Sequence, residues 1–169
     1  LVTAATITAG VRVWDAARSY GEVDAEALFG LAVTEQDIAS ALPFAEIPFS
    51  GDRTRISFAG LPAGGAGETP ALGTIEYAYD AGRRAWERRQ WSYPGGHREA
   101  ARPELLVRNV VAAQLSYVGM TPEGEARAVQ ETWTDTTSFP VRVGIVLTLD
   151  RDGERTSYER TVFIPATGK

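Results

Sequence analysis

The fold is decided by residues 1–42, which read LVTAATITAGVRVWDAARSYGEVDAEALFGLAVTEQDIASAL without a proline. Apolar or small residues return at every third or fourth position, and charged residues fall mostly between them, which is the spacing of an amphipathic helix. The positions of this stripe are Ile7, Val11, Trp14, Ala17, Gly21, Ala25, Leu28, Ala32, Ile38 and Leu42. The pattern predicts one long helix that ends at Leu42-Pro43, because a residue before proline is disfavoured in the helical conformation.

The predicted helix is too long for the domain that follows it. At about 1.5 Å per residue it would measure roughly 60 Å, whereas a compact domain of this size is only about 40 Å across. One end should therefore overhang with its apolar stripe uncovered, and we expect a partner to cover it. The expected partner interface consists of Val2, Ile7, Gly10, Val11, Trp14 and Arg18.

Three glycines interrupt the predicted helix, at Gly10, Gly21 and Gly30. Each lowers helix stability by about 1 kcal/mol relative to alanine, so a close approach of another helix would explain their presence. A kink near Gly21 remains the alternative.

From Phe44 onward the apolar period changes to two, which predicts seven or eight antiparallel strands. The clearest hairpin surrounds Asp80-Ala81-Gly82, with Ile75, Tyr77 and Tyr79 on one face, and strict alternation over 141–149 indicates the central strand. The predicted fold class is α+β, with a long N-terminal amphipathic helix packed on antiparallel β-sheet. Residues 1–43 would hold the helix and residues 44–169 the β domain, together forming one globular unit.

Composition and charge exclude several classes of function. The net charge of −5 disfavours a protein that follows a nucleic-acid backbone, and we interpret the cluster of Arg83, Arg84, Arg88 and Arg89 as a strand face. The chain has no cysteine, which excludes disulfides and thiolate metal sites. It has no apolar run long enough to span a membrane, and it begins without methionine, so we expect a longer precursor.

No set of residues predicts catalysis, a metal site or a cofactor, and we expect a protein that is not an enzyme. His97, the only histidine, lies in a Gly-Gly-His-Arg loop without an orienting acid nearby. Asp150-Arg151-Asp152-Gly153 starts like a calcium loop but lacks the final glutamate, so a hairpin explains it better. The tryptophans and tyrosines of the strands indicate an aromatic core, with a binding cleft as the alternative.

The order of elements resembles that of type IV pilin-like proteins, and the strand half is similar to the minor pseudopilin J family (GspJ) of bacterial type II secretion systems. The residues that carry the resemblance are Leu28, Leu42-Pro43, Ile75-Glu76-Tyr77, Asp80-Ala81-Gly82, Trp86, Leu105 to Val110, Leu115-Ser116-Tyr117, Trp133, Phe139 to Val143, and Ile145 to Leu149.

The resemblance implies a structural subunit of a pseudopilus. Such a protein is made as a precursor, cleaved and N-methylated by a prepilin peptidase, and anchored in the inner membrane by a segment upstream of Leu1. It would join minor pseudopilins of the I and K types at the tip of a periplasmic pseudopilus and promote protein secretion, without nucleic acid or cofactor.

Two alternatives remain open at this stage. The same fold serves as a minor pilin of a type IV pilus or competence system. An α+β ligand-binding module would instead enclose an apolar pocket lined by Trp86, Trp91 and Tyr117.

Overall fold

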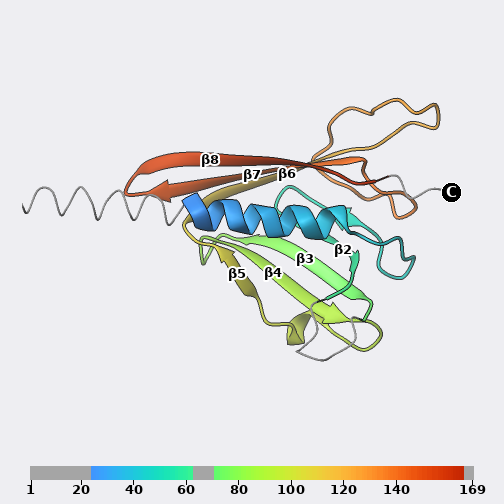
Figure 1. The fold of residues 1–169 in the computed structure, drawn as a ribbon, viewed down its shortest axis with the longest axis horizontal. Helices are drawn as coiled ribbons and strands as arrows, with labels where there is room; N and C mark the ends of the chain where they lie inside the picture. The colour runs from blue at the N-terminus through green and yellow to red at the C-terminus, as the bar shows by residue number, and fades with distance from the viewer. Residues whose placement is uncertain (1–23, 63–70, 166–169) are drawn as a thin grey trace, which may run out of the picture.

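The computed structural model describes residues 24–62 and 71–165. This part of the chain begins with an α-helix of residues 24–39 and continues as strands with one short 3-10 helix, η1 (Arg98–Ala100). The strands are β1 (Ser50–Gly51), β2 (Arg55–Gly60), β3 (Gly73–Asp80), β4 (Ala85–Ser92), β5 (Glu104–Val107), β6 (Val110–Val118), β7 (Arg142–Arg151) and β8 (Glu154–Phe163). They form two antiparallel sheets, and the helix lies between them (Figure 1).

One side of the helix faces the interior, because its inward positions recur at the helical spacing. The buried positions are Ala27, Gly30, Leu31, Thr34 and Ile38. The Thr34 hydroxyl donates to the Gly30 carbonyl at 2.8 Å and accepts the Trp86 Nε1–H at 3.1 Å, so this buried polar group is satisfied.

The first sheet has the strand order β1-β2-β3-β4-β5. The predicted hairpin of β3 and β4 is confirmed, and Ile75, Tyr77 and Tyr79 lie on the face that packs on the helix. Directly opposite them on β4, Trp86 pairs with Tyr79 and Arg88 with Tyr77. The sheet therefore presents aromatic rings and one guanidinium to the helix.

The second sheet has the order β6-β7-β8, and β7 is central as the alternation predicted. Its odd-numbered residues, Val143, Ile145, Leu147 and Leu149, are buried. The β7–β8 hairpin turns at Asp152-Gly153, where both residues have positive φ and the Asp150 carboxylate accepts the Gly153 N–H at 3.0 Å. The Asp150 segment is thus a turn, in agreement with the hairpin interpretation.

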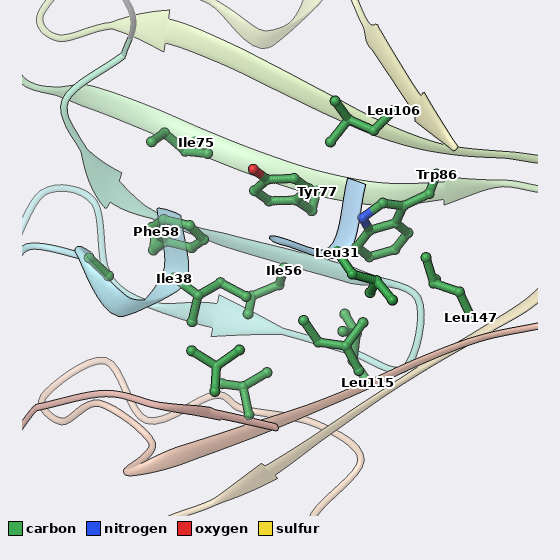
Figure 2. Close-up of a cluster of buried hydrophobic side chains, with 14 of the residues drawn as sticks. Leu31, Ile38, Ile56, Phe58, Ile75, Tyr77, Trp86, Leu106, Leu115 and Leu147 are labelled. Atoms are coloured by element: carbon green, nitrogen blue, oxygen red, sulfur yellow. The ribbon is translucent and has the colours of Figure 1, made fainter. Parts of the chain in front are cut away.

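A single hydrophobic core joins the helix to both sheets. Figure 2 shows Leu31 and Ile38 of the helix among side chains from β2, β3, β4 and β5, with Leu115 and Leu147 closing the cluster from the second sheet. Tyr77 and Trp86 stack with ring centroids 5.9 Å apart. Burial of this much apolar surface is the main force that holds the three layers together.

The predicted fold class is wrong for the described residues, which are mainly antiparallel strand with one short helix. The helix ends at residue 39 because Ser40 closes a turn and the Leu42 N–H then bonds the Ala59 carbonyl at 2.9 Å, so the chain already joins the first sheet there. Residues 1–23, which include most of the expected rod, lie outside the described part. The division at residue 43 stays a prediction.

The interpretation of Gly30 is also corrected. A Cβ on Gly30 would lie 2.4 Å from Val107 Cγ2 and 3.3 Å from the Leu106 carbonyl oxygen. The glycine therefore lets β5 of the same chain approach the helix, not a second helix.

Candidate functional site

The side of the helix that faces away from the core is apolar. Leu28 and Phe29 keep 45% and 65% of their surface exposed, and Ala25 and Ala32 beside them are exposed as well. Positions 25, 28, 29 and 32 are neighbours on one side of a helix. We call these four residues the exposed helix face; no strand lies in front of the helix in the view of Figure 1.

The structure separates residues that the sequence had placed on one stripe. Ile38 is fully buried, whereas Ala25, Leu28 and Ala32 are exposed. At 100° per residue, positions 28, 32, 25 and 29 span about 100° of the helix surface, and position 38 lies about 80° outside the Leu28 edge of this arc. Phe29 was missed, although it lies only about 40° from Ala25 on the helical wheel.

Ionic contacts hold both flanks of the helix: Glu26 contacts the connection between β5 and β6, and on the opposite flank Asp24 and Glu35 contact the second sheet. Glu26 accepts the Arg108 backbone N–H at 2.7 Å and pairs with Arg108 Nη2 at 3.1 Å. Asp24 accepts the Tyr158 hydroxyl and lies 3.6 Å from Arg151 Nη2, and Glu35 lies 3.7 Å from Arg160 Nε. These contacts hold the rotation of the helix about its axis and keep the exposed helix face outward.

A half-buried polar group on the same side of the helix as Glu26 attaches the helix to the first sheet. Asp37 Oδ2 accepts the Tyr77 hydroxyl at 2.7 Å and Arg88 Nε at 2.8 Å, and Arg88 Nη1 reaches Glu104 at 3.3 Å. Burial of the Tyr77 hydroxyl, followed by its hydrogen bond to Asp37, raises the pKa of Tyr77 far above its ordinary value, so the phenol remains a donor.

The partner interface expected from the sequence, Val2, Ile7, Gly10, Val11, Trp14 and Arg18, lies entirely outside the described residues. It stays a prediction. Among the described residues, Ala25, Leu28 and Ala32 of the exposed helix face belong to the predicted apolar stripe.

Two of the three aromatic residues proposed for a pocket, Trp86 and Tyr117, belong to the core instead, and the third, Trp91, is half-buried. Trp86 and Tyr117 are fully buried, and the Tyr117 hydroxyl donates to the Asp52 carbonyl at 2.9 Å. Burial of Tyr117 raises the pKa of its hydroxyl well above the ordinary value. Neither ring lines an open pocket, which removes the geometric basis of the ligand-binding alternative that named them.

The arginine cluster is a set of ion pairs; Arg83 and Arg84 lie in the turn before β4, and Arg88 is buried, so the cluster is only partly the strand face that was predicted. Arg83 and Arg89 both contact Glu87, at 3.0 and 3.7 Å, and Arg84 lies 3.9 Å from Asp150. Arg88 is the buried partner of Asp37. The cluster therefore does not present an uncompensated positive surface to a polyanion.

Two clefts open near the segment that follows the helix. One, of about 230 Å³, is lined by Trp133 and Thr134 with β1 and β2 residues. The other, of about 420 Å³, is lined by Pro43, Phe44, Pro48, Phe139 and the hydroxyl-bearing residues 136–138. His97 lines neither cleft. The first cleft also carries the charged side chains of Asp52 and Arg55, and the second combines apolar walls with hydroxyl groups.

Residues 24–62 and 71–165 hold neither a cluster of metal-binding side chains nor a helix that could span a membrane. That part of the chain contains no group of three or more acidic, histidine or cysteine side chains arranged to hold a metal ion. Its helix lacks the length and hydropathy of a membrane span.

Comparison with known proteins relates the fold to a secretion machine. No protein family model matches the chain, and no curated protein matches its sequence. Among solved structures, the chain is similar to a chain of the GspK-GspI-GspJ complex of the type 2 secretion system of enterotoxigenic Escherichia coli, with 18% identity and a TM-score of 0.54. The match covers 82% of this chain and 94% of that chain. The likeness shows a fold like that of a type II secretion pseudopilin.

Proposed function

We propose that the protein is a minor pseudopilin of a bacterial type II secretion system, of the J type, that acts as a structural subunit of the pseudopilus tip. The exposed helix face is the observation that carries this proposal, because it leaves Leu28 and Phe29 in solvent on a helix otherwise fixed on both flanks. The likeness to one chain of a complex of three secretion proteins supports the same role.

The partners in this proposal are minor pseudopilins of the I and K types, whose helices would pack against the exposed helix face. Covering a leucine or phenylalanine side chain contributes about 1.5–3 kcal/mol, which is enough for two such residues to decide an association. The small side chains of Ala25 and Ala32 beside them would let a partner helix approach closely. Assembly, not catalysis, is the proposed activity.

The location follows from the same proposal. The described domain would lie in the periplasm, anchored in the inner membrane by a processed and N-methylated segment before it joins the pseudopilus.

The proposal is tested by the double variant Leu28→Glu/Phe29→Glu in the full chain. Co-purification with the I- and K-type pseudopilins of the same organism should fall at least tenfold, while the urea unfolding midpoint stays within error because both side chains are exposed. The matched control is Leu105→Glu on β5, where a leucine of similar exposure, 50%, lies away from the exposed helix face. Unchanged co-purification of the double variant would contradict the proposal.

A further inference from the structure

A second surface lies on the outer side of the β6–β8 sheet, facing away from the helix. Val118, Arg142 and Phe163 are direct neighbours across β6, β7 and β8. The residues next to them along the strands, Tyr117, Val143 and Val162, belong to the core. Because side chains alternate along a strand, the first three all point outward.

The row continues onto a segment beside β6. Tyr117 and Gln130 exchange backbone hydrogen bonds of 2.8 Å in both directions, which places Val129 next to Val118 on the outer side. Met120 lies next along the chain and bridges to Ala126. With neighbouring segments about 4.8 Å apart, the row from Val129 to Phe163 spans roughly 14 Å.

This row is unusually apolar for a solvent-facing side. Phe163 is 70% exposed, Val129 60% and Met120 43%. Val118 is buried but does not belong to the main core cluster. Neighbouring side chains on the outer side of the sheet therefore cover it. We call Val118, Met120, Val129, Arg142 and Phe163 the outer-sheet patch.

Arg142 places a positive charge in the middle of the outer-sheet patch. Its side chain is exposed, and among the described residues no carboxylate lies within ion-pair distance of it. Arg155 and Arg160 of the neighbouring strand β8 contact Asp150 and Glu35, at 4.0 and 3.7 Å. The patch thus offers a guanidinium flanked by apolar side chains, which suits a carboxylate flanked by apolar side chains.

We propose that the outer-sheet patch binds an extended peptide segment of a partner protein in which an acidic residue is flanked by apolar residues. The carboxylate pairs with Arg142, and apolar side chains two positions away on either side cover Phe163 and Val129 or Met120.

A second copy of this chain fits the outer-sheet patch poorly. A two-fold interface centred on the patch would bring Arg142 against its own symmetry mate, and like charges directly opposed are destabilising. The patch also lies on the opposite side of the sheet from the helix, so this proposal goes beyond the proposed function and stands or falls separately from it.

The test uses a phage-displayed library of random nine-residue peptides selected on the immobilised full chain. Selected sequences should carry Asp or Glu with apolar residues two positions away, because side chains alternate along an extended segment. A synthetic peptide from the selection should bind Arg142→Gln roughly tenfold more weakly, as expected for loss of a charged hydrogen bond. Phe163→Ser should weaken binding by at least as much.

The control variant is Arg102→Gln, which removes another exposed arginine for which no contact with a carboxylate is found among the described residues. It should bind the peptide like the unmodified chain. Replacing the acidic residue of the peptide by its amide should weaken binding to the unmodified chain. The same replacement should not weaken binding to the Arg142→Gln variant any further. Selection without acidic residues, binding that ignores both patch variants, or Phe163-dependent self-association without peptide would each overturn the proposal.

Discussion

Asp37 is the residue that couples the helix to the first sheet most directly. One of its oxygens accepts both the Tyr77 hydroxyl and the Arg88 guanidinium, and the side chains of Arg88 and Asp37 are only 11% and 18% exposed. A charge as buried as that of Arg88 is destabilising without its ionic partner, because water cannot fully take the partner's place. Nothing in the sequence paired Asp37 with β3 and β4, since the contact joins residues forty or more positions apart.

Asp37→Asn should lower the free energy of unfolding by about 2–4 kcal/mol, because Arg88 then keeps only Glu104 as a charged partner. Urea unfolding followed by circular dichroism measures the change. Glu104→Gln is the comparison. The Glu104 side chain is 58% exposed, so this substitution should lower the free energy of unfolding by less than about 1 kcal/mol. Equal effects of the two substitutions would disprove the central role of Asp37.

The carboxyl group of Asp135 should contribute to stability in a pH-dependent way. Hydrogen bonds from the Ser138 and Thr137 side chains and from the Thr137 N–H lower the pKa of Asp135 to about 2. A depressed carboxyl pKa stabilises the folded state above the ordinary value near 4, and this stabilisation disappears as the pH falls through about 2. Carboxyl NMR of the full chain should therefore show Asp135 titrating near 2.

Ser138→Ala should raise that midpoint toward the ordinary value of an aspartate, because it removes the largest contribution to the pKa shift. Ser157→Ala is the control, since its hydroxyl contacts Thr148 instead. If the midpoint of Asp135 stays the same in Ser138→Ala, the hydroxyl does not cause the shift.

At the scale of elements, the contact between the helix and β5 depends on one missing side chain. Val107 is fully buried against Gly30, and it is β-branched, so it has little freedom to move aside. In an open helix, alanine would be better than glycine by about 1 kcal/mol. At position 30, steric crowding of the new methyl group against Val107 should outweigh this gain in helix propensity.

Gly30→Ala should therefore destabilise the protein by about 1–2 kcal/mol in thermal or urea unfolding. Gly82→Ala provides the comparison, because its added methyl group would meet only the Asp80 carboxylate, at 3.3 Å; that change should stay within about 0.5 kcal/mol. A stabilised Gly30→Ala variant would show that helix and strand separate easily.

Strands and helix differed in how far the sequence could predict them. β7 was predictable because every second residue is buried against one core, and the Asp152-Gly153 hairpin because the turn requires positive φ. The open side of the helix was not predictable, since Ala25 and Ala32 on the exposed side and Ala27 on the buried side are equivalent in sequence. Only tertiary contacts decide which side is covered.

At the scale of the whole molecule, two sheets cover opposite flanks of one short helix and leave its third side exposed among the described residues (Figure 1). Asn109 takes a positive φ between β5 and β6, where the chain passes from one sheet to the other. The sequence predicted antiparallel strands but not this division. The exposed helix face is thus a consequence of the layered fold, and it is the surface on which the proposed role in assembly depends.

The most direct measurement is photo-crosslinking from position 29 of the full chain, with benzoylphenylalanine in place of Phe29, in cells that also produce the I- and K-type pseudopilins. If the exposed helix face contacts a partner, position 29 should form a covalent product with one of these two proteins, and position 105, which is similarly exposed on β5, should form none. If the three proteins co-purify and position 29 still crosslinks to neither, the exposed helix face is not the surface through which this protein assembles.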